Sequence, residues 1–224
     1  MSYMRDRCVT VVYTVPSAYI RWLNKGDLRR NIPSLRLMLY AGEPFAASWL
    51  RKVMLCLPQT RVANIYGPTE TNIVTCHPLT TLPEDGDTIP IGYPVADTEI
   101  YIVDEQLKRL PAGVMGEILV RGSTVFAGYF NDDALTAQKL IRSPFHGYPT
   151  LLCRTGDYGC QSDEGELRYF GRMDNMVKTR GYRVEPGEVE NILATIQGVT
   201  EAAIIPLADD KYGATLHACL VLAD

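Results

Sequence analysis

The chain has 224 residues, of which 46% are hydrophobic and 21% charged, a composition typical of a globular protein with at least one sizeable core. Its formal net charge of −4 argues against a nucleic-acid-binding protein, because such domains carry clustered basic residues and the lysines and arginines here are scattered. The longest apolar runs are far shorter than a membrane span, and the six cysteines include no Cys-x-x-Cys pair, so we expect a cytoplasmic protein without a membrane segment, a zinc site or a disulfide framework.

Apolar strands and amphipathic helices alternate in the first part of the chain. The β-branched run Val9–Val15 predicts a strand, and a helix is expected over Ala18–Leu23. Leu35–Ala41 and Arg61–Ile65 predict two further strands with a helix between them. The apolar residues of that second helix share one face and are Ala46, Trp49, Leu50, Val53, Met54 and Leu57. Two strand–helix units that lead into a third strand indicate a parallel sheet covered by helices, so the predicted class is α/β.

From residue 73 onward the periodicity shortens, and turns rich in proline, glycine and aspartate separate short strands, which indicates a β-rich, barrel-like section. The expected strands are Ile73–Cys76, Thr98–Val103, Glu117–Arg121, Leu151–Cys153 and Leu167–Phe170. A helix is expected over Asp133–Ile141, because the preceding Asn131 and Asp132 can cap its first turn. Thr155–Asp157 is expected to be a turn.

Another pattern begins after residue 173. Short strands are expected near Met176–Thr179 and Tyr182–Val184, followed by a helix that begins at Pro186. The residues of this helix expected to face inward are Val189, Ile192, Leu193 and Ile196. Two strands, Ala202–Pro206 and Leu216–Leu222, close the pattern. We therefore predict a large domain over residues 1–173 and a truncated small α+β domain over residues 174–224.

The stretch Asn64–Asn72 carries the strongest chemical signal. A strand ends at Gly67-Pro68, and Thr69 and Glu70 follow directly, a hydroxyl donor and a carboxylate of the kind that binds Mg²⁺. Tyr66, just before the break, offers a flat face for a base. The alternative is a hairpin corner with two solvated polar residues.

This stretch resembles the signature of the adenylate-forming superfamily, which includes adenylation domains of nonribosomal peptide synthetases, acyl-CoA synthetases and luciferases. Further matches follow in the order of that family, so the resemblance covers essentially the whole chain. The matching segments are Tyr66–Thr71, Gly116–Gly122 with Gly128–Phe130, Arg154–Asp157, Gly171–Asn175 and Lys178–Glu185.

The resemblance implies a role for each nucleotide-contacting residue. Tyr66 would stack on adenine, Thr69 would contact the α-phosphate and Glu70 would bind Mg²⁺, with ATP as the nucleotide. Asp157 would accept hydrogen bonds from both ribose hydroxyls, and the alternative for it is a residue that only stabilises a turn. Arg172 would contact ribose or phosphate, and the alternative for it is a surface ion pair. The backbone of the segment Gly42-Glu43 would lie along the adenine edge.

The resemblance also implies a movement of the small domain. Asp174 matches the hinge about which that domain swings between an adenylating and a thioester-forming pose. Lys178 and Gly181 match the loop that reaches the active site in the second pose, where Gly181 would leave room for a pantetheine arm. The sequence departs from the family at Met176, where glutamine is usual, and methionine has no amide to make the polar contact of that position.

The implied acyl pocket is apolar. By their offset from the motifs, its lining residues are Tyr13, Leu39, Ala41, Ile65, Ile73 and Val74, and the alternative for each of them is ordinary core. None is charged, which favours a small or medium neutral side chain. The segment Met176–Glu185 resembles stand-alone activators of amino acids that load carrier proteins.

The expected activity is ATP-dependent activation of a carboxylate, favoured to be an amino acid, followed by thioester transfer to a carrier-protein pantetheine or CoA. The family's phosphate loop and its terminal lysine have no match here. We therefore expect residues 1–173 to be the C-terminal part of the family's large domain, and the chain to be an incomplete piece that is inactive alone. The alternatives are a non-catalytic nucleotide-binding or partner-docking module and, for the substrate, an acyl-CoA ligase.

Overall fold

The computed structural model of the chain describes residues 2–26, 28, 32–84, 86–172, 177–184, 186–193 and 196–222. These residues belong to two compact units. The first unit comprises Met1–Val62, Thr80–Thr88 and Asp174–Asp224, and the second comprises Ala63–Leu79 and Ile89–Met173. The predicted domain boundary between residues 173 and 174 lies outside the described residues and stays a prediction.

The first unit contains the strand–helix alternation predicted from the sequence. It begins with a short helix α1 (Ser2–Asp6), which the sequence did not predict. The elements that follow are β1 (Val11–Thr14), α2 (Pro16–Asn24), β2 (Leu37–Tyr40), α3 (Ala47–Cys56) and the start of β3 (Arg61–Tyr66). β1 and β2 are parallel, with Val11 opposite Leu37.

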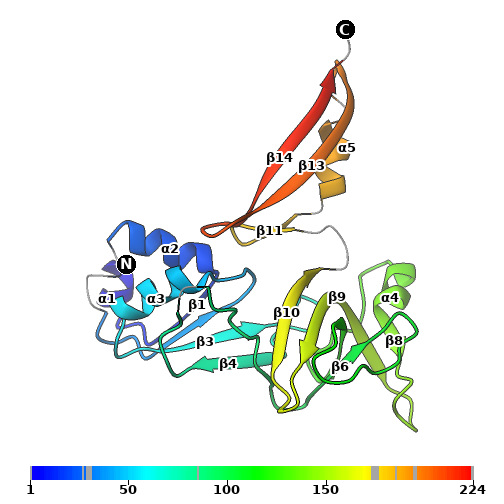
Figure 1. Cartoon of the computed structure of the whole chain (residues 1–224), viewed down its shortest axis with the longest axis horizontal. Coiled ribbons are helices and arrows are strands. Elements are labelled where there is room, and N and C mark those ends of the chain that lie inside the picture. The colour runs from blue at the N-terminus through cyan, green and yellow to red at the C-terminus, as the bar shows by residue number, and fades with distance from the viewer. Residues whose placement is uncertain are drawn as a thin grey trace. The chain divides into compact units, whose positions relative to one another are not determined.

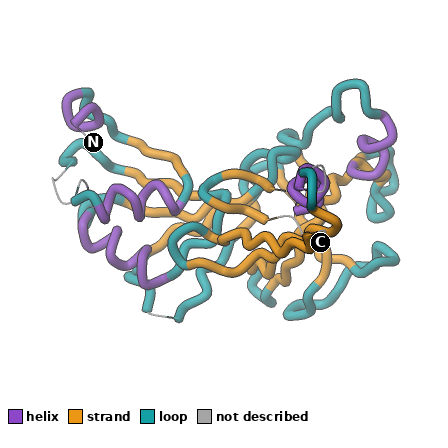
Figure 2. Tube along the Cα trace, turned by 90° about the horizontal axis from the view of Figure 1, so that it is seen from above, coloured by secondary structure: helices purple, strands orange, loops and turns teal. Residues whose placement is uncertain are grey.

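Helices α2 and α3 lie beside the strands of this unit (Figures 1 and 2). In α2 the buried residues include Tyr19, whose hydroxyl donates to the carbonyl oxygens of Val12 in β1 (3.2 Å) and Leu39 in β2 (2.9 Å). Leu50 and Val53 of α3 are buried, as the predicted apolar face requires. The parallel, helix-covered section expected from the sequence is therefore confirmed.

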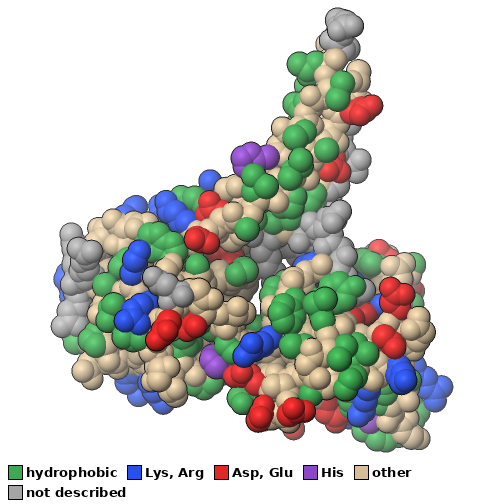
Figure 3. All heavy atoms as spheres, in the orientation of Figure 1, with side chains coloured by type: hydrophobic (Ala, Val, Ile, Leu, Met, Phe, Trp, Pro, Cys, Tyr) green, Lys and Arg blue, Asp and Glu red, His purple; other side chains and the backbone are tan. Residues whose placement is uncertain are grey.

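The C-terminal part of the first unit is an α+β arrangement of two hairpins and a helix. Its elements are β11 (Val177–Thr179), β12 (Tyr182–Val184), α5 (Pro186–Leu193), β13 (Val199–Asp209) and β14 (Gly213–Leu222), with β11–β12 and β13–β14 each antiparallel. The Thr179 hydroxyl donates to the Ala214 carbonyl oxygen (2.6 Å), which links the two hairpins. Ile192 and Ile196 were expected to face inward, but both are exposed. Hydrophobic side chains also lie on the surface of the β13–β14 hairpin (Figure 3).

The second unit is dominated by antiparallel strands. It contains β4 (Thr75–Leu79), β5 (Tyr93–Pro94), β6 (Thr98–Val103), β7 (Gly116–Gly122), α4 (Asp133–Lys139), β8 (Leu140–Arg142), β9 (Leu151–Gln161) and β10 (Leu167–Arg172). One sheet has the order β10-β9-β7-β6, and β8 pairs with β9. Its main core cluster consists of Tyr66, Val74, Ile91, Ile102, Ile118, Val120 and Leu167. The predicted β-rich section is confirmed.

Two local predictions in this unit are wrong. Thr155–Asp157 is not a turn but lies inside the long strand β9, where these three residues face the single residue Ile118 of β7 and form a bulge. The helix expected to reach Ile141 ends at Lys139, because Leu140 pairs with Cys153 as the first residue of β8.

Asp157 and Arg172 are cross-strand partners in β9 and β10, and both side chains are buried. A buried ion pair that loses one partner leaves an uncompensated charge. We therefore expect Arg172→Met to lower the free energy of unfolding by roughly 3–5 kcal/mol. Urea denaturation of the chain measures this change. The matched control is Arg168→Met, at an exposed position of the same strand, and equal losses in both variants would contradict the prediction.

The thiols are free, and their reactivity should differ strongly. Burial, with the nearby negative charge of Glu70 as a smaller cause, raises the pKa of the Cys153 thiol to about 12, whereas Cys8 and Cys219 are exposed. Because the thiolate is the reactive form, about one Cys153 in 10⁴ is reactive at pH 8. Iodoacetamide at pH 8 should label Cys8 and Cys219 in the folded chain and Cys153 only after denaturation, as peptide mass spectrometry would reveal. Rapid labelling of Cys153 in the folded chain would be the opposite result.

Candidate active site

The family's signature motif lies in the loop that connects β3 and β4, residues 67–74, here called the signature loop. This loop is tight. The Val74 N–H donates to the Tyr66 carbonyl oxygen (2.8 Å) and closes the loop at its base. A Cβ atom placed on Gly67 would lie 1.5 Å from the carbonyl oxygen of Asn72. Any side chain at position 67 would therefore force the loop apart, which explains why the break in the strand pattern is a glycine.

Tyr66 is buried in the core of the second unit and is attached through its hydroxyl. That hydroxyl donates to Oδ2 of Asp157 (2.5 Å), and the ring contacts Tyr169 with a centroid separation of 5.9 Å. Burial, followed by the negative charge of Asp157, raises the pKa of Tyr66 well above its usual value. The phenol therefore stays protonated and remains a hydrogen-bond donor across the physiological pH range.

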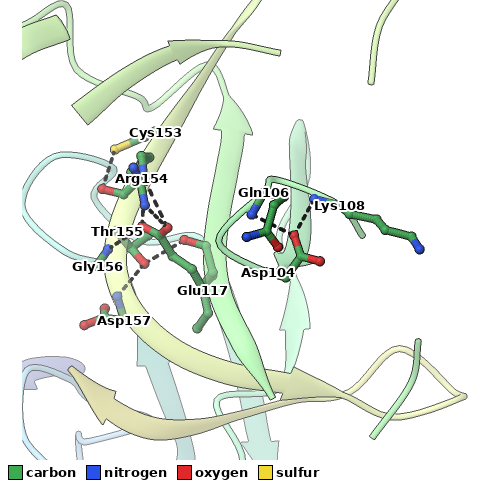
Figure 4. Close-up of polar contacts among 10 residues, drawn as sticks. Asp104, Gln106, Lys108, Glu117, Cys153, Arg154, Thr155, Gly156 and Asp157 are labelled. Carbon is green, nitrogen blue, oxygen red and sulfur yellow. Dashed lines mark hydrogen bonds and ion pairs between the residues drawn. The ribbon is translucent and has the colours of Figure 1, made fainter. Parts of the chain in front are cut away.

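Asp157 lies at the centre of this group, with 1% of its surface exposed. Arg172 donates through Nη1 to Oδ1 of Asp157 (3.0 Å) and to the carbonyl oxygen of Thr155 (3.1 Å). The Thr155 hydroxyl accepts from the Asp157 N–H (3.0 Å) and donates to the Ile118 carbonyl oxygen (2.7 Å). Figure 4 shows Thr155 and Asp157 in their strand. Both carboxylate oxygens of Asp157 are thus already bonded within the protein.

A second carboxylate supports the bulge from the neighbouring strand. Glu117 of β7 is buried and accepts from Arg154 Nη2 (2.6 Å), and its other oxygen accepts from the Gly156 N–H (3.3 Å; Figure 4). Gly156 has a positive φ of 73°, and a Cβ atom there would lie 2.9 Å from Nη2 of Arg172. Glycine at this position therefore permits the close approach of the arginine to Asp157.

Glu70 and Thr69 differ in their surroundings. Thr69 is exposed, whereas Glu70 is 8% exposed and its Oε1 accepts from the Tyr129 hydroxyl (2.6 Å). A buried carboxylate held by a hydroxyl suits a cation such as Mg²⁺, which needs only one or two protein carboxylates when phosphates and water supply its other ligands. Within the described part of the chain, no group of three or more histidine, cysteine, aspartate and glutamate side chains forms a metal site by itself.

The first unit contains a separate set of predicted site residues. The Glu43 carboxylate is buried and accepts from the Ser17 N–H (3.0 Å) and from the Gly181 N–H. Gly181 and Gly42 both have positive φ, and Cβ atoms on them would lie 3.3 Å and 3.5 Å from Val15. Gly42, Glu43 and Gly181 are therefore brought together. The contact is made by the side chain of Glu43, whereas the sequence had predicted a role for the backbone of this residue only.

The remaining predicted residues stay expectations. Asp174 and Met176 lie outside the described residues, and of Lys178 only the backbone is described. Among the pocket residues Ala41, Ile65 and Val74 are buried, Leu39 and Ile73 are half-buried and Tyr13 is 58% exposed. Tyr13, Leu39 and Ala41 belong to the first unit, and Ile65, Ile73 and Val74 to the second.

Sequence reasoning missed three polar residues that hold the site. Glu117, Thr155 and Tyr129 each bond to a predicted residue or to its bulge. A signal was present for all three, because each lies in a segment that matches the family and had no assigned role. No helix in the described part of the chain is long and apolar enough to cross a membrane.

Comparison with known proteins agrees with the fold and the motifs. The family described as "AMP-binding enzyme" matches residues 1–130. Tyrocidine synthase 2 of Brevibacillus parabrevis is 38% identical over 220 residues, covering 98% of this chain and 6% of that protein. Gramicidin S synthase 2 of Brevibacillus brevis is 35% identical over 213 residues, covering 94% of this chain and 5% of that protein. The chain thus spans a small part of the relatives that it matches.

A solved structure extends the likeness to the fold of nearly the whole chain. It is holo-PA1221, an NRPS protein containing adenylation and PCP domains bound to a vinylsulfonamide inhibitor. The two structures align with a TM-score of 0.87 and 27% sequence identity, covering 98% of this chain and 38% of that one. The family match over more than half of the residues confirms the resemblance found in the motifs: this chain belongs to the AMP-binding enzyme family.

Proposed function

We propose that the chain is part of an enzyme that activates a carboxylate with ATP, forming an acyl-adenylate and pyrophosphate, and then transfers the acyl group to a thiol. An amino acid is the favoured carboxylate, and a carrier-protein pantetheine is favoured over CoA as the acceptor. Similarity to the two peptide synthases and to an NRPS protein with adenylation and PCP domains supports both choices.

One observation carries the proposal. Tyr66, Asp157 and Arg172 come from three different strands and form one buried hydrogen-bonded group, at the end of the strand whose next loop carries Glu70. Buried charges are costly unless they are paired, and a buried group of this kind beside a polar loop is a candidate for a functional site.

In this proposal each residue has one task. Tyr66 stacks on the adenine, and the backbone of Gly42-Glu43 lies along the edge of the adenine. Asp157 accepts from the ribose hydroxyls, since an ionised carboxylate has about four lone-pair sites and can accept several hydrogen bonds at once. Arg172 orients that carboxylate and contacts ribose or phosphate.

The phosphate end of the nucleotide is assigned to the signature loop. Thr69, exposed at the loop surface, donates its hydroxyl to the α-phosphate, where negative charge increases during attack by the carboxylate. Glu70 would hold Mg²⁺, which neutralises phosphate charge when it is bound.

The acyl pocket is proposed from apolar residues, with Ala41, Ile65 and Val74 as its buried members. Leu39, Ile73 and Tyr13 complete it. Such a lining favours a neutral side chain of small or medium size. Asp174 would be the hinge for the second half-reaction, in which Lys178 and Gly181 serve the thiol acceptor.

The proposed activity is tested by exchange of labelled pyrophosphate into ATP, using the protein in which this chain naturally occurs. We expect exchange that depends on one or a few neutral amino acids. Exchange only with carboxylic acids that lack an amino group would support an acyl-CoA ligase instead. Nucleotide binding without exchange for any acid would support the non-catalytic alternative.

Asp157 and Glu70 should affect different kinetic constants. Asp157→Asn should raise the KM for ATP about 10- to 100-fold, because a hydrogen bond to a charged acceptor contributes about 1.5–3 kcal/mol. Glu70→Gln should mainly lower kcat, since it removes a metal ligand. Steady-state exchange kinetics of both variants test this, with Asp163→Asn at an exposed position as the control. Small and equal effects in both site variants would argue that the nucleotide binds elsewhere.

A further inference from the structure

Two hydrogen bonds from one short segment hold Glu70. The Tyr129 hydroxyl donates to Oε1 of its carboxylate (2.6 Å), and the Phe126 N–H donates to its backbone carbonyl oxygen (2.8 Å). The rings of Phe126 and Tyr129 pack edge to face with a centroid separation of 4.9 Å. The same segment therefore fixes both the backbone and the side chain of Glu70.

Helix α4 holds this segment, residues 126–129, through a hydrogen bond to Thr136. The Thr136 hydroxyl accepts from the Tyr129 N–H (2.8 Å) and donates to the carbonyl oxygen of Asp132 (2.8 Å), the residue that caps the helix. Gly128 has a positive φ of 138°, and a Cβ atom there would lie 2.8 Å from Cγ2 of Thr136. The absence of a side chain at Gly128 thus lets Tyr129 lie against the helix.

The bond from Tyr129 suits a carboxylate that binds a cation. A hydroxyl–carboxylate bond is charge-assisted, and its length here is within the short range of 2.5–2.7 Å expected for that type. This bond uses one of about four lone-pair sites of the carboxylate. It also restricts the side-chain rotamers, whose ordering would otherwise reduce cation affinity.

We propose that Tyr129 is a positioning residue that holds the Glu70 carboxylate in place as a ligand for a divalent cation. This inference rests on the proposed function, and it assigns Tyr129 no contact with the nucleotide. Hydrogen-bonding partners of metal ligands typically affect metal affinity by about 10- to 100-fold, which sets the size of the expected effect.

The test measures cation binding directly as well as activity. In the protein that contains this chain, Mn²⁺ is titrated in the presence of a non-hydrolysable ATP analogue, and free Mn²⁺ is followed by electron paramagnetic resonance. Tyr129→Phe keeps the ring against Phe126 and removes only the hydroxyl. We expect its Kd for Mn²⁺, and the Mg²⁺ concentration for half-maximal exchange, to rise at least about tenfold. The control, Tyr148→Phe, changes an exposed tyrosine of the same unit and should leave both values unaltered.

A double-mutant cycle separates positioning from a general structural effect. If Tyr129 acts through Glu70, adding Tyr129→Phe to Glu70→Gln should weaken Mn²⁺ binding no further than Glu70→Gln alone. Should Tyr129→Phe fail to fold, Thr136→Val removes the anchor of Tyr129 without touching Glu70 and should raise the Kd in the same direction.

The possible failures are distinguishable. Wild-type protein that binds Mn²⁺ with the analogue, together with an unchanged Kd in Tyr129→Phe, overturns the inference about Tyr129 and leaves the proposed function standing. Wild-type protein that shows neither nucleotide-dependent Mn²⁺ binding nor exchange overturns both.

Discussion

The burial of one negative charge constrains the second unit more than any other single feature. The Asp157 carboxylate has almost no contact with solvent, and an ionised carboxylate in such a position is tolerated only when it is paired and hydrogen-bonded. Arg172 supplies the charge and Tyr66 the hydroxyl, which requires β10 and β3 to end where β9 presents the aspartate. The bulge in β9, with Gly156 at its centre, gives the guanidinium access. The ends of β3 and β10 thus meet at one carboxylate inside β9.

The two carboxylates of the candidate site are held by different chemistry, and the difference suits their proposed tasks. Asp157 is neutralised by a permanent cation, since an arginine side chain does not lose its proton in proteins. Glu70 accepts a hydrogen bond from the hydroxyl of Tyr129, a neutral donor that orients the carboxylate without adding a positive charge. A neutral ribose needs an oriented acceptor, whereas a divalent cation needs the negative charge itself. Under the proposed function, Asp157 takes the sugar and Glu70 takes the metal.

Local sequence patterns predicted most elements and failed where distant pairing decides the structure. The bounds of β6 and β12 agree with prediction, because β-branched and aromatic runs between turn residues leave few alternatives. Thr155–Asp157 looks like a turn in isolation, and only its alignment with β7 makes it a strand. The motifs selected Tyr66, Asp157 and Arg172, which the structure brings together. The contacts of Tyr129 with Glu70 and of Glu117 with Gly156 join residues far apart in sequence, so spacing alone could not reveal them.

The polar residues of β9 also determine how that strand can be aligned. From Cys153 to Gly159, buried positions of β9 alternate with less buried ones, and Cys153, Thr155 and Asp157 are among the buried ones. A slip of one residue would exchange the two faces of the strand, placing Arg154 inside and separating Asp157 from Arg172. An apolar inner face would tolerate such a shift more easily, because hydrophobic contacts are not directional. Thr155 and Asp157 therefore favour the native register of β9 over shifted registers while the chain folds.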